Sequence, residues 1–224
     1  MTLLITPRTM QIQTAMRWQR AMLDPIWFLR DFVYTVDTHH QPAIRPFPSE
    51  APHIPILTRL WQYRKPPLMS VRKSRQMFIT WWGAAISLWD ALHPGKLIML
   101  QSKRLEDAVG DESTGDGPLG RAKAILSLIP RGVGLIEGTH YQKTSARIVF
   151  PGLRSAVWAV PQGADIMRQR TASGIWSDES HFQDEFSASY TGAAPCLRGG
   201  GWFLSTSTAN PGAALDLHED RLTQ

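Results

Sequence analysis

Apolar and polar positions alternate along the middle of the chain with two different spacings. Short apolar runs predict buried strands at 68–72, 96–101, 146–150, 155–160, around 175 and at 201–205. Between them, apolar residues spaced three and four apart predict helices at 56–63, 78–92, from 105 onward and at 121–129. Strands that alternate with helices are typical of parallel sheets with crossover helices. We therefore expect an α/β fold with a mainly parallel central sheet flanked by helices.

The first part of the chain lacks this alternation. Up to about residue 36, aromatic and basic residues occur at spacings that fit one or two helices, broken at Asp24 and Pro25. The following stretch, 39–55, is so rich in proline that it predicts an extended connector without regular elements. We therefore divide the chain into an N-terminal helical appendage with its connector, residues 1–54, and a core, residues 55–224.

Composition narrows the class of protein. The chain has 224 residues, of which 43% are hydrophobic and nine are tryptophan, enough for a well-packed core. No apolar run reaches the length of a membrane span and the start does not fit a secretory signal, so we expect no membrane partner. The single cysteine, Cys196, excludes an intramolecular disulfide and a cysteine-based zinc site. A net charge of +5 attracts anions such as DNA or ATP without specifying either.

Two adjacent acids, Asp178 and Glu179, follow the strand-like run around residue 175. In a P-loop ATPase, the first such acid holds Mg²⁺ and the second polarises the attacking water. Two further Asp-Glu pairs, at 111–112 and 184–185, do not follow strand-like runs. Taken alone, the pair at 178–179 fits an acidic turn after a strand better than a catalytic site, so the ATPase interpretation requires a phosphate-binding partner.

The candidate partner is the loop 73–80, Lys-Ser-Arg-Gln-Met-Phe-Ile-Thr, between the strand 68–72 and the next helix. With Thr80 as the Mg²⁺-binding hydroxyl, the pattern G-x-x-x-x-G-K-[ST] requires glycine at positions 73 and 78 and lysine at 79. The chain has Lys73, Phe78 and Ile79 there, so only the threonine matches. Lys73 and Arg75 could fold over the phosphates and supply the missing charge, although an ordinary basic turn has the same spacing.

The loop, the acid pair and the later Ser-Thr-Ser-Thr at 205–208 together resemble the ATPase domain of tailed-phage terminase large subunits, from about residue 56 to 212. The resemblance implies a P-loop NTPase fold that binds ATP and Mg²⁺. It also implies the following roles: nucleotide binding by Lys73, Ser74, Arg75, Gln76 and Thr80, adenine recognition by Gln62, Mg²⁺ binding by Thr80 and Asp178, catalysis by Glu179, an arginine finger at Arg168 with Arg170 in reserve, and coupling to DNA movement by Ser205, Thr206, Ser207 and Thr208.

As a terminase relative, the chain is expected to be the ATPase of a motor that moves double-stranded DNA into a procapsid. Its expected partners are DNA, a portal protein and a small terminase subunit, in a homo-oligomeric ring that works in the host cytoplasm and transiently at the portal vertex. Too little sequence follows residue 212 for the nuclease domain of a whole terminase, so no nuclease activity is expected.

Two other readings remain open at the level of sequence. Phe78 and Ile79 also fit a non-catalytic nucleic-acid-binding or assembly module with a degenerate phosphate loop. A different α/β ATPase, such as a helicase, would require helicase motifs after residue 212, and none can be identified there.

Overall fold

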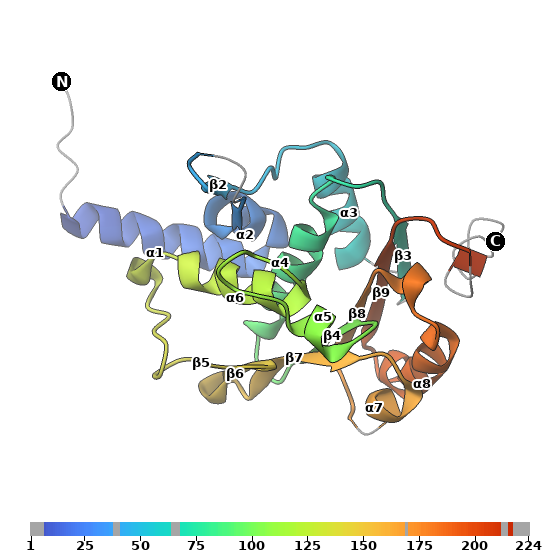
Figure 1. Ribbon diagram of the computed structural model, residues 1–224. Coiled ribbons are helices and arrows are strands. Elements are labelled where there is room, and N and C mark those ends of the chain that lie inside the picture. Colours follow the sequence, from blue (N-terminus) through green and yellow to red (C-terminus); the bar gives the residue numbers. More distant parts are fainter. Residues whose placement is uncertain (1–6, 38–40, 64–67, 169, 212–214, 217–224) are drawn as a thin grey trace.

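A seven-stranded sheet forms the centre of the protein (Figure 1). The structure is a computed structural model that describes residues 7–37, 41–63, 68–168, 170–211 and 215–216. The strand order is β3 (Leu68–Arg72), β9 (Trp202–Ser207), β8 (Gly174–Asp178), β4 (Leu97–Ser102), β7 (Ser155–Pro161), β6 (Arg147–Phe150) and β5 (Gln142–Thr144). The first five strands run parallel, whereas β6 and β5 extend the sheet as antiparallel strands. The expected α/β fold with a mainly parallel sheet flanked by helices is therefore confirmed, as is the hairpin of β6 and β7.

The central strands bury side chains on both faces, which explains their short, nearly continuous apolar runs. In β8, Ile175 faces one core cluster and Trp176 faces the other. Met99 of β4 and Phe203 of β9 lie in the same cluster as Ile175. A parallel sheet covered by helices on both faces produces this pattern, because neighbouring residues of a strand point to opposite faces.

Helices cover the two faces of the sheet (Figure 1). One face carries α4 (Ile79–Ala91) and α6 (Pro118–Leu128), which pack on each other, with the short α5 (Leu105–Val109) beside them. The other face carries α7 (Ala164–Arg168) and α8 (Phe186–Arg198). Gly83 allows α4 to approach the sheet closely, since a Cβ at this position would lie 2.5 Å from the Trp176 ring.

The N-terminal helices α1 (Pro7–Leu23) and α2 (Pro25–Phe32) confirm the predicted break at Asp24, whose side chain accepts a hydrogen bond from the Ile26 amide. Phe28 and Phe32 of α2 belong to the same core cluster as α4. The helix α3 (His53–Gln62) begins earlier than the predicted residue 56. The first part of the chain therefore packs directly on the sheet-covering helices.

The structure differs from the sequence prediction in the proline-rich connector. Residues 44–46 form the strand β2 (Ile44–Pro46), which pairs with β1 (Tyr34–Val36) in a two-stranded antiparallel sheet. The prediction of no regular element was therefore wrong for these residues. So short a ladder can end at Pro46, because a proline at a strand terminus removes no hydrogen bond from the middle of the ladder.

Several elements were not predicted: the helix α8 and the shorter elements α7, β5 and the 3₁₀ helices 131–133, 151–153 and 180–182. The helix α8 has few strongly apolar residues and contains Pro195, which obscures its helical pattern. Across the part of the chain that the structure describes, no helix is both long enough and apolar enough to cross a membrane.

Candidate phosphate and magnesium site

The carboxyl ends of β3, β8 and β9 lie side by side, because β9 pairs with both of the other strands. In the ladders, Arg72 lies opposite Ser207, and Asp178 lies opposite Thr206. The loop after β3, the two acids at the end of β8 and the hydroxyl residues of β9 therefore meet at one edge of the sheet. This is the edge at which open parallel sheets bind ligands.

The loop between β3 and α4 keeps a backbone that glycine normally supplies. Phe78 has φ of 57° and Gln76 has φ of 63°, both in the left-handed region. The Phe78 side chain is 42% exposed and packs edge-on against Phe47, with 6.5 Å between ring centroids. The bulky residue at the usual glycine position therefore bears a backbone strain of about 1–2 kcal/mol, and its ring packs against Phe47.

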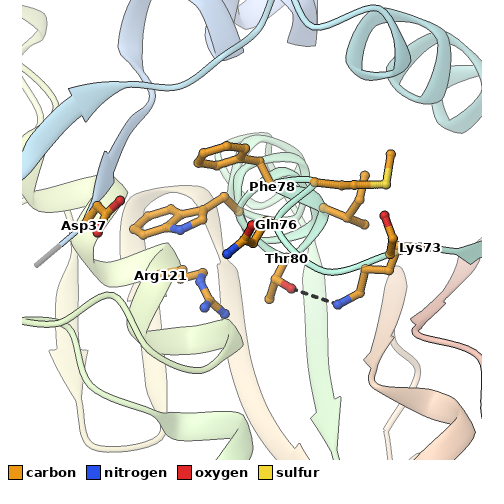
Figure 2. A pocket seen from close by; sticks show the side chains of 10 residues that line it. Asp37, Lys73, Gln76, Phe78, Thr80 and Arg121 are labelled. Atoms are coloured by element: carbon orange, nitrogen blue, oxygen red, sulfur yellow. Dashed lines mark hydrogen bonds between the residues drawn. The ribbon is translucent and has the colours of Figure 1, made fainter. Parts of the chain in front are cut away.

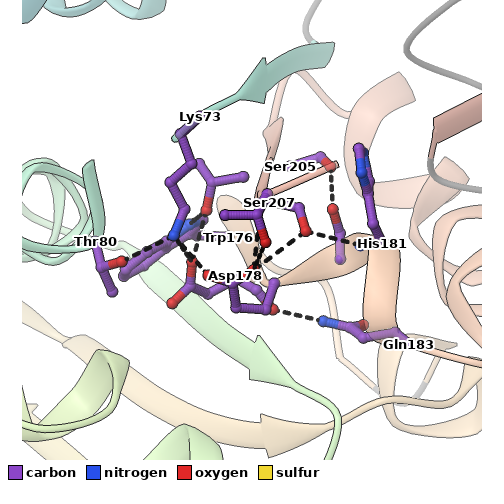
Figure 3. A network of polar contacts seen from close by, with 12 residues as sticks. Lys73, Thr80, Trp176, Asp178, His181, Gln183, Ser205 and Ser207 are labelled. Atoms are coloured by element: carbon purple, nitrogen blue, oxygen red, sulfur yellow. Dashed lines mark hydrogen bonds and ion pairs between the residues drawn. The ribbon is translucent and has the colours of Figure 1, made fainter. Parts of the chain in front are cut away.

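Lys73 occupies the centre of the site (Figure 3). Its Nζ donates to Glu179 Oε1 at 2.6 Å and to Thr80 Oγ1 at 3.4 Å, and lies 4.0 Å from Asp178 Oδ1. Ile79, which stands where the usual pattern has lysine, is only 2% exposed and belongs to the core. The ammonium group therefore reaches the site from the front of the loop, as the sequence suggested.

Asp178 is held in a buried chain of hydrogen bonds. Trp176 Nε1 donates to Thr206 Oγ1 at 2.9 Å, and Thr206 Oγ1 donates to Asp178 Oδ1 at 2.8 Å. Burial raises the pKa of Asp178 above its ordinary value, and the Lys73 ammonium offsets this only in part. The chain of contacts fixes the carboxylate at the end of β8.

Glu179 lies in a different environment although it is the next residue. Burial acts to raise its pKa, but the hydrogen bond and the charge of Lys73 outweigh burial, and the pKa of Glu179 lies below its ordinary value. Its Oε2 also accepts from Ser207 Oγ at 3.2 Å and from the amide and hydroxyl of Thr208, both at 3.3 Å. Glu179 is therefore ionised at neutral pH and tied to both neighbouring strand ends.

All four residues of the Ser-Thr-Ser-Thr segment contact the segment that carries the acids. Ser205 shares a hydrogen bond of 2.7 Å with Ser180, and Ser207 accepts one from the His181 amide at 3.2 Å. Thr206 and Thr208 contact the two acids themselves. The geometry brings the candidate coupling segment into contact with the candidate catalytic acids, while its role in coupling stays a prediction.

Thr80 and Asp178 are suited to bind Mg²⁺, because a hydroxyl and a carboxylate are hard oxygen ligands. The Lys73 ammonium lies within 4.0 Å of both and marks a position where a cation is stabilised. The described residues contain no cluster of three or more His, Cys, Asp or Glu side chains that could hold a metal by themselves. A magnesium ion at this position would therefore depend on further ligands from phosphate oxygens and water, which is typical of nucleotide sites.

Two cavities meet at the loop. The first, of about 500 Å³, includes Ser74, Gln76, Phe78, Trp81 and Asp37 in its lining (Figure 2). The second, of about 560 Å³, extends over the two acids and is lined by Lys73, Arg75, Gln76, Thr80, Ser102, Lys103, Asp107, Asp116, Gly117, Pro118, Arg121, Asp178, Glu179, Phe182 and Thr208. The predicted loop residues and acids therefore line a shared space. No local pattern pointed to Lys103 or Arg121, because tertiary packing alone brings them to this space.

Three predicted residues lie elsewhere. Gln62 accepts a hydrogen bond of 2.6 Å from Arg59 and lines neither of the two cavities. Arg168 is exposed on α7, 3.9 Å from Asp165, and Arg170 lies over the Trp158 ring at 4.7 Å. An arginine that acts on a neighbouring subunit would lie outside its own site, so the roles of Arg168 and Gln62 stay predictions.

The remaining Asp-Glu pairs have structural contacts instead. Glu112 accepts from Lys143 Nζ at 2.7 Å and from Ser127 Oγ at 2.6 Å. Asp184 forms an exposed ion pair with Lys103 at 2.8 Å. Of the three pairs, Asp178 and Glu179 are the ones that the fold places beside the loop.

Neither a protein-family model nor a curated protein sequence matches the chain. In structure, however, the chain is similar to the large terminase of bacteriophage HK97, with a TM-score of 0.64 over 90% of this chain and 14% sequence identity. It is also similar to a mutant form of the large terminase ATPase domain of Thermus phage P74-26, with a TM-score of 0.50, 15% identity and coverage of 72% of this chain and 66% of that one.

The chain has the P-loop NTPase fold of phage large terminase ATPase domains. It spans about two fifths of the length of the HK97 protein, 41%. In this terminase-like fold, β9 separates β3, which precedes the loop 73–80, from β8, which carries the acids. This order explains why the hydroxyl residues of β9 contact the acids of β8.

Proposed function

We propose that the chain is the ATPase of a viral DNA-packaging terminase, which couples ATP hydrolysis to the translocation of double-stranded DNA into a procapsid. One observation supports this most directly: in a terminase-like fold, side-chain oxygens of Thr80, Asp178 and Glu179 all lie within 4.0 Å of the Lys73 ammonium. The proposed ligands are ATP and Mg²⁺.

The phosphates of ATP would lie against the loop, where backbone amides and the beginning of α4 favour an anion. Lys73 would turn from Glu179 towards the phosphates, and Ser74, Arg75 and Gln76 would contact them from the same loop. Thr80 and Asp178 would hold Mg²⁺, which neutralises charge on the phosphates. Glu179, released from Lys73, would accept a hydrogen bond from the attacking water.

The contacts of β9 support a role in coupling. Ser207 and Thr208 donate to the same Glu179 oxygen, so a movement of Glu179 after hydrolysis changes the hydrogen bonds at the end of β9. A conformational change that starts at the phosphates can therefore reach this strand. DNA translocation, a ring of subunits, a portal and small-subunit partner, and work at the procapsid portal in the host cytoplasm belong to the same proposal.

The test is steady-state ATP hydrolysis by the purified chain, with and without double-stranded DNA and over a range of protein concentrations. We expect Mg²⁺-dependent hydrolysis that Glu179→Gln lowers by at least about 10²-fold, because a general base contributes about 10²–10⁴-fold. Glu185→Gln is the matched control, since it makes the same change in another Asp-Glu pair and should leave the rate unchanged. If the chain neither binds nor hydrolyses ATP, the alternative of an assembly module with a degenerate loop is favoured.

The position of the arginine finger can be tested in the same assay by complementation. Arg168→Ala and Glu179→Gln should each be inactive alone if Arg168 acts on the ATP of a neighbouring subunit. A mixture of the two should recover activity, because an intact Arg168 then faces an intact Glu179 at some interfaces. Equal inactivity of the mixture and its components would exclude a finger in trans at Arg168.

A further inference from the structure

Arg121 lies at the boundary between the two cavities. It projects from the first turn of α6 and lines both of them (Figure 2). Three other residues line both cavities, Lys73, Gln76 and Thr80, and all three belong to the phosphate loop. Arg121 therefore faces the loop from the opposite side of the same space.

The guanidinium of Arg121 has few contacts for a cation in this position. Its Nε is buried and has no hydrogen-bond partner among the described residues. Among the described residues, Arg121 forms no ion pair within 4.0 Å, and its guanidinium carbon lies 5.6 Å from the centre of the Trp81 ring. Arginine has five donors in a fixed planar arrangement, so most of its capacity remains for a ligand.

The electrostatic surroundings indicate what kind of ligand this is. Burial lowers the pKa of Arg121, whereas the charges of Asp178, Asp116 and Glu179 act to raise it. Two of these three acids are the proposed magnesium ligand and the proposed catalytic residue. A partly buried cation that lacks a direct ion pair is stabilised when an anion completes the site.

We propose that Arg121 contacts the terminal phosphate of ATP bound to its own subunit. This inference rests on the proposed ATPase function. Lys73 and the loop amides hold the phosphate chain from one side, and Arg121 closes the space from α6, next to the acids at which hydrolysis occurs. The planar guanidinium suits two phosphate oxygens at once. Arg121 is thus a catalytic residue in cis, distinct from the finger in trans proposed for Arg168.

A contact with the terminal phosphate has a specific signature in binding. Arg121→Ala should weaken the affinity for a non-hydrolysable ATP analogue about tenfold or more, while the affinity for ADP stays within about twofold, because ADP lacks the contacted group. The turnover number should fall by about 10²–10³-fold, as for the removal of a donor that stabilises transition-state charge. Arg121→Lys keeps the charge but not the planar fork, so it should recover only part of both quantities.

The measurements are calorimetric titrations with ADP and with the analogue, both with Mg²⁺, together with hydrolysis kinetics and thermal unfolding of each variant. Arg131→Ala is the matched control, because Arg131 is an exposed arginine just beyond the other end of α6 and outside both cavities. It should match the unmodified chain throughout. If Arg121→Ala is unfolded, the affinities of Arg121→Lys for ADP and for the analogue are compared with those of the unmodified chain instead.

The outcomes separate this inference from the proposed function. If the unmodified chain binds no nucleotide, the proposed function fails, and Arg121 fails with it. If the unmodified chain binds and hydrolyses ATP but Arg121→Ala loses ADP and analogue affinity equally, or neither, the contact with the terminal phosphate is refuted while the ATPase function stands.

Discussion

The ion pair between Lys73 and Glu179 makes a testable prediction about nucleotide affinity. In the structure, Lys73 Nζ lies 2.6 Å from Glu179 Oε1, so the residue proposed to bind phosphates is already engaged. Nucleotide binding must therefore break this pair before Lys73 can reach a phosphate. Glu179→Gln replaces the carboxylate by a neutral amide, which holds the ammonium less strongly. We expect the variant to bind a non-hydrolysable ATP analogue more tightly than the unmodified chain, although it hydrolyses ATP far more slowly.

The magnitude follows from the exposure of the two partners. The Lys73 side chain is 9% exposed, whereas that of Glu179 is 41% exposed, so solvent screens the pair in part. The free energy that the pair contributes to folding should lie between that of an exposed ion pair and that of a buried hydrogen bond to a charged group, at about 1 kcal/mol. Removing it should therefore tighten binding about fivefold. The nucleotide-free variant should lose up to about the same free energy of unfolding, because the same contact stabilises the folded chain.

Calorimetric titration of the analogue in the presence of Mg²⁺ and chemical denaturation without nucleotide give the two quantities. The opposite signs are the essential result, tighter binding together with lower stability of the nucleotide-free chain. Glu185→Gln serves as the control for the general loss of one negative charge, and it should change neither quantity. The reasoning is refuted if Glu179→Gln leaves the affinity unchanged, or if Glu185→Gln tightens binding by the same factor.

Two further predictions concern stability. Gly83→Ala should lower the free energy of unfolding by about 1–3 kcal/mol, because the added methyl group meets the Trp176 ring at 2.5 Å; Gly152→Ala, with no atom within 4 Å, should stay within about 0.5 kcal/mol of the unmodified chain in the same denaturation assay. Burial acts to raise the pKa of Glu112, but the contact with Lys143 outweighs burial and the pKa is lowered. The ionised Glu112 therefore stabilises the folded chain at any pH above its unfolded-state pKa. This stability is lost as the pH falls through the folded-state pKa. Glu112→Gln should therefore be less stable at pH 7 by up to about 1 kcal/mol. A difference in thermal unfolding that stays constant as the pH is lowered through the ordinary pKa of glutamate and beyond would contradict this assignment.

Most of the correct predictions rest on patterns formed by residues near one another in the sequence. The runs at 68–72 and 96–101 and the helix at 78–92 were predicted to within a residue or two, because each is a compact segment with one dominant spacing. The acid pair was placed correctly at the end of β8, whose last residue is Asp178, although Gly174 and Ser177 interrupt its apolar run. A Cβ at Gly174 would meet the Trp202 ring at 2.1 Å, so glycine is required there by a neighbour that is distant in the sequence.

The helix α8 and the strand β2 show where local patterns fail. Both contain proline and neither has a regular apolar spacing, yet Phe186 and Ala193 of α8 are fully buried against the sheet. Tertiary contacts override weak local preferences in such segments. No local pattern could have supplied this information, because the surface that α8 covers is built from several strands, and two of them, β3 and β4, lie far from α8 in the chain.

The sequence by itself determined the alternation of strands and helices, the loop that begins at Lys73 and the acid pair at the end of β8, because these depend on spacings within single segments. Only the tertiary structure decided that Phe78 adopts a left-handed backbone with its ring packed on Phe47, that Lys73 bridges Thr80 and Glu179, and that Arg121 faces them from α6. The physical reason is the order of strands in the sheet: β9, the last strand along the chain, lies between β3 and β8 and fixes the distances across the site.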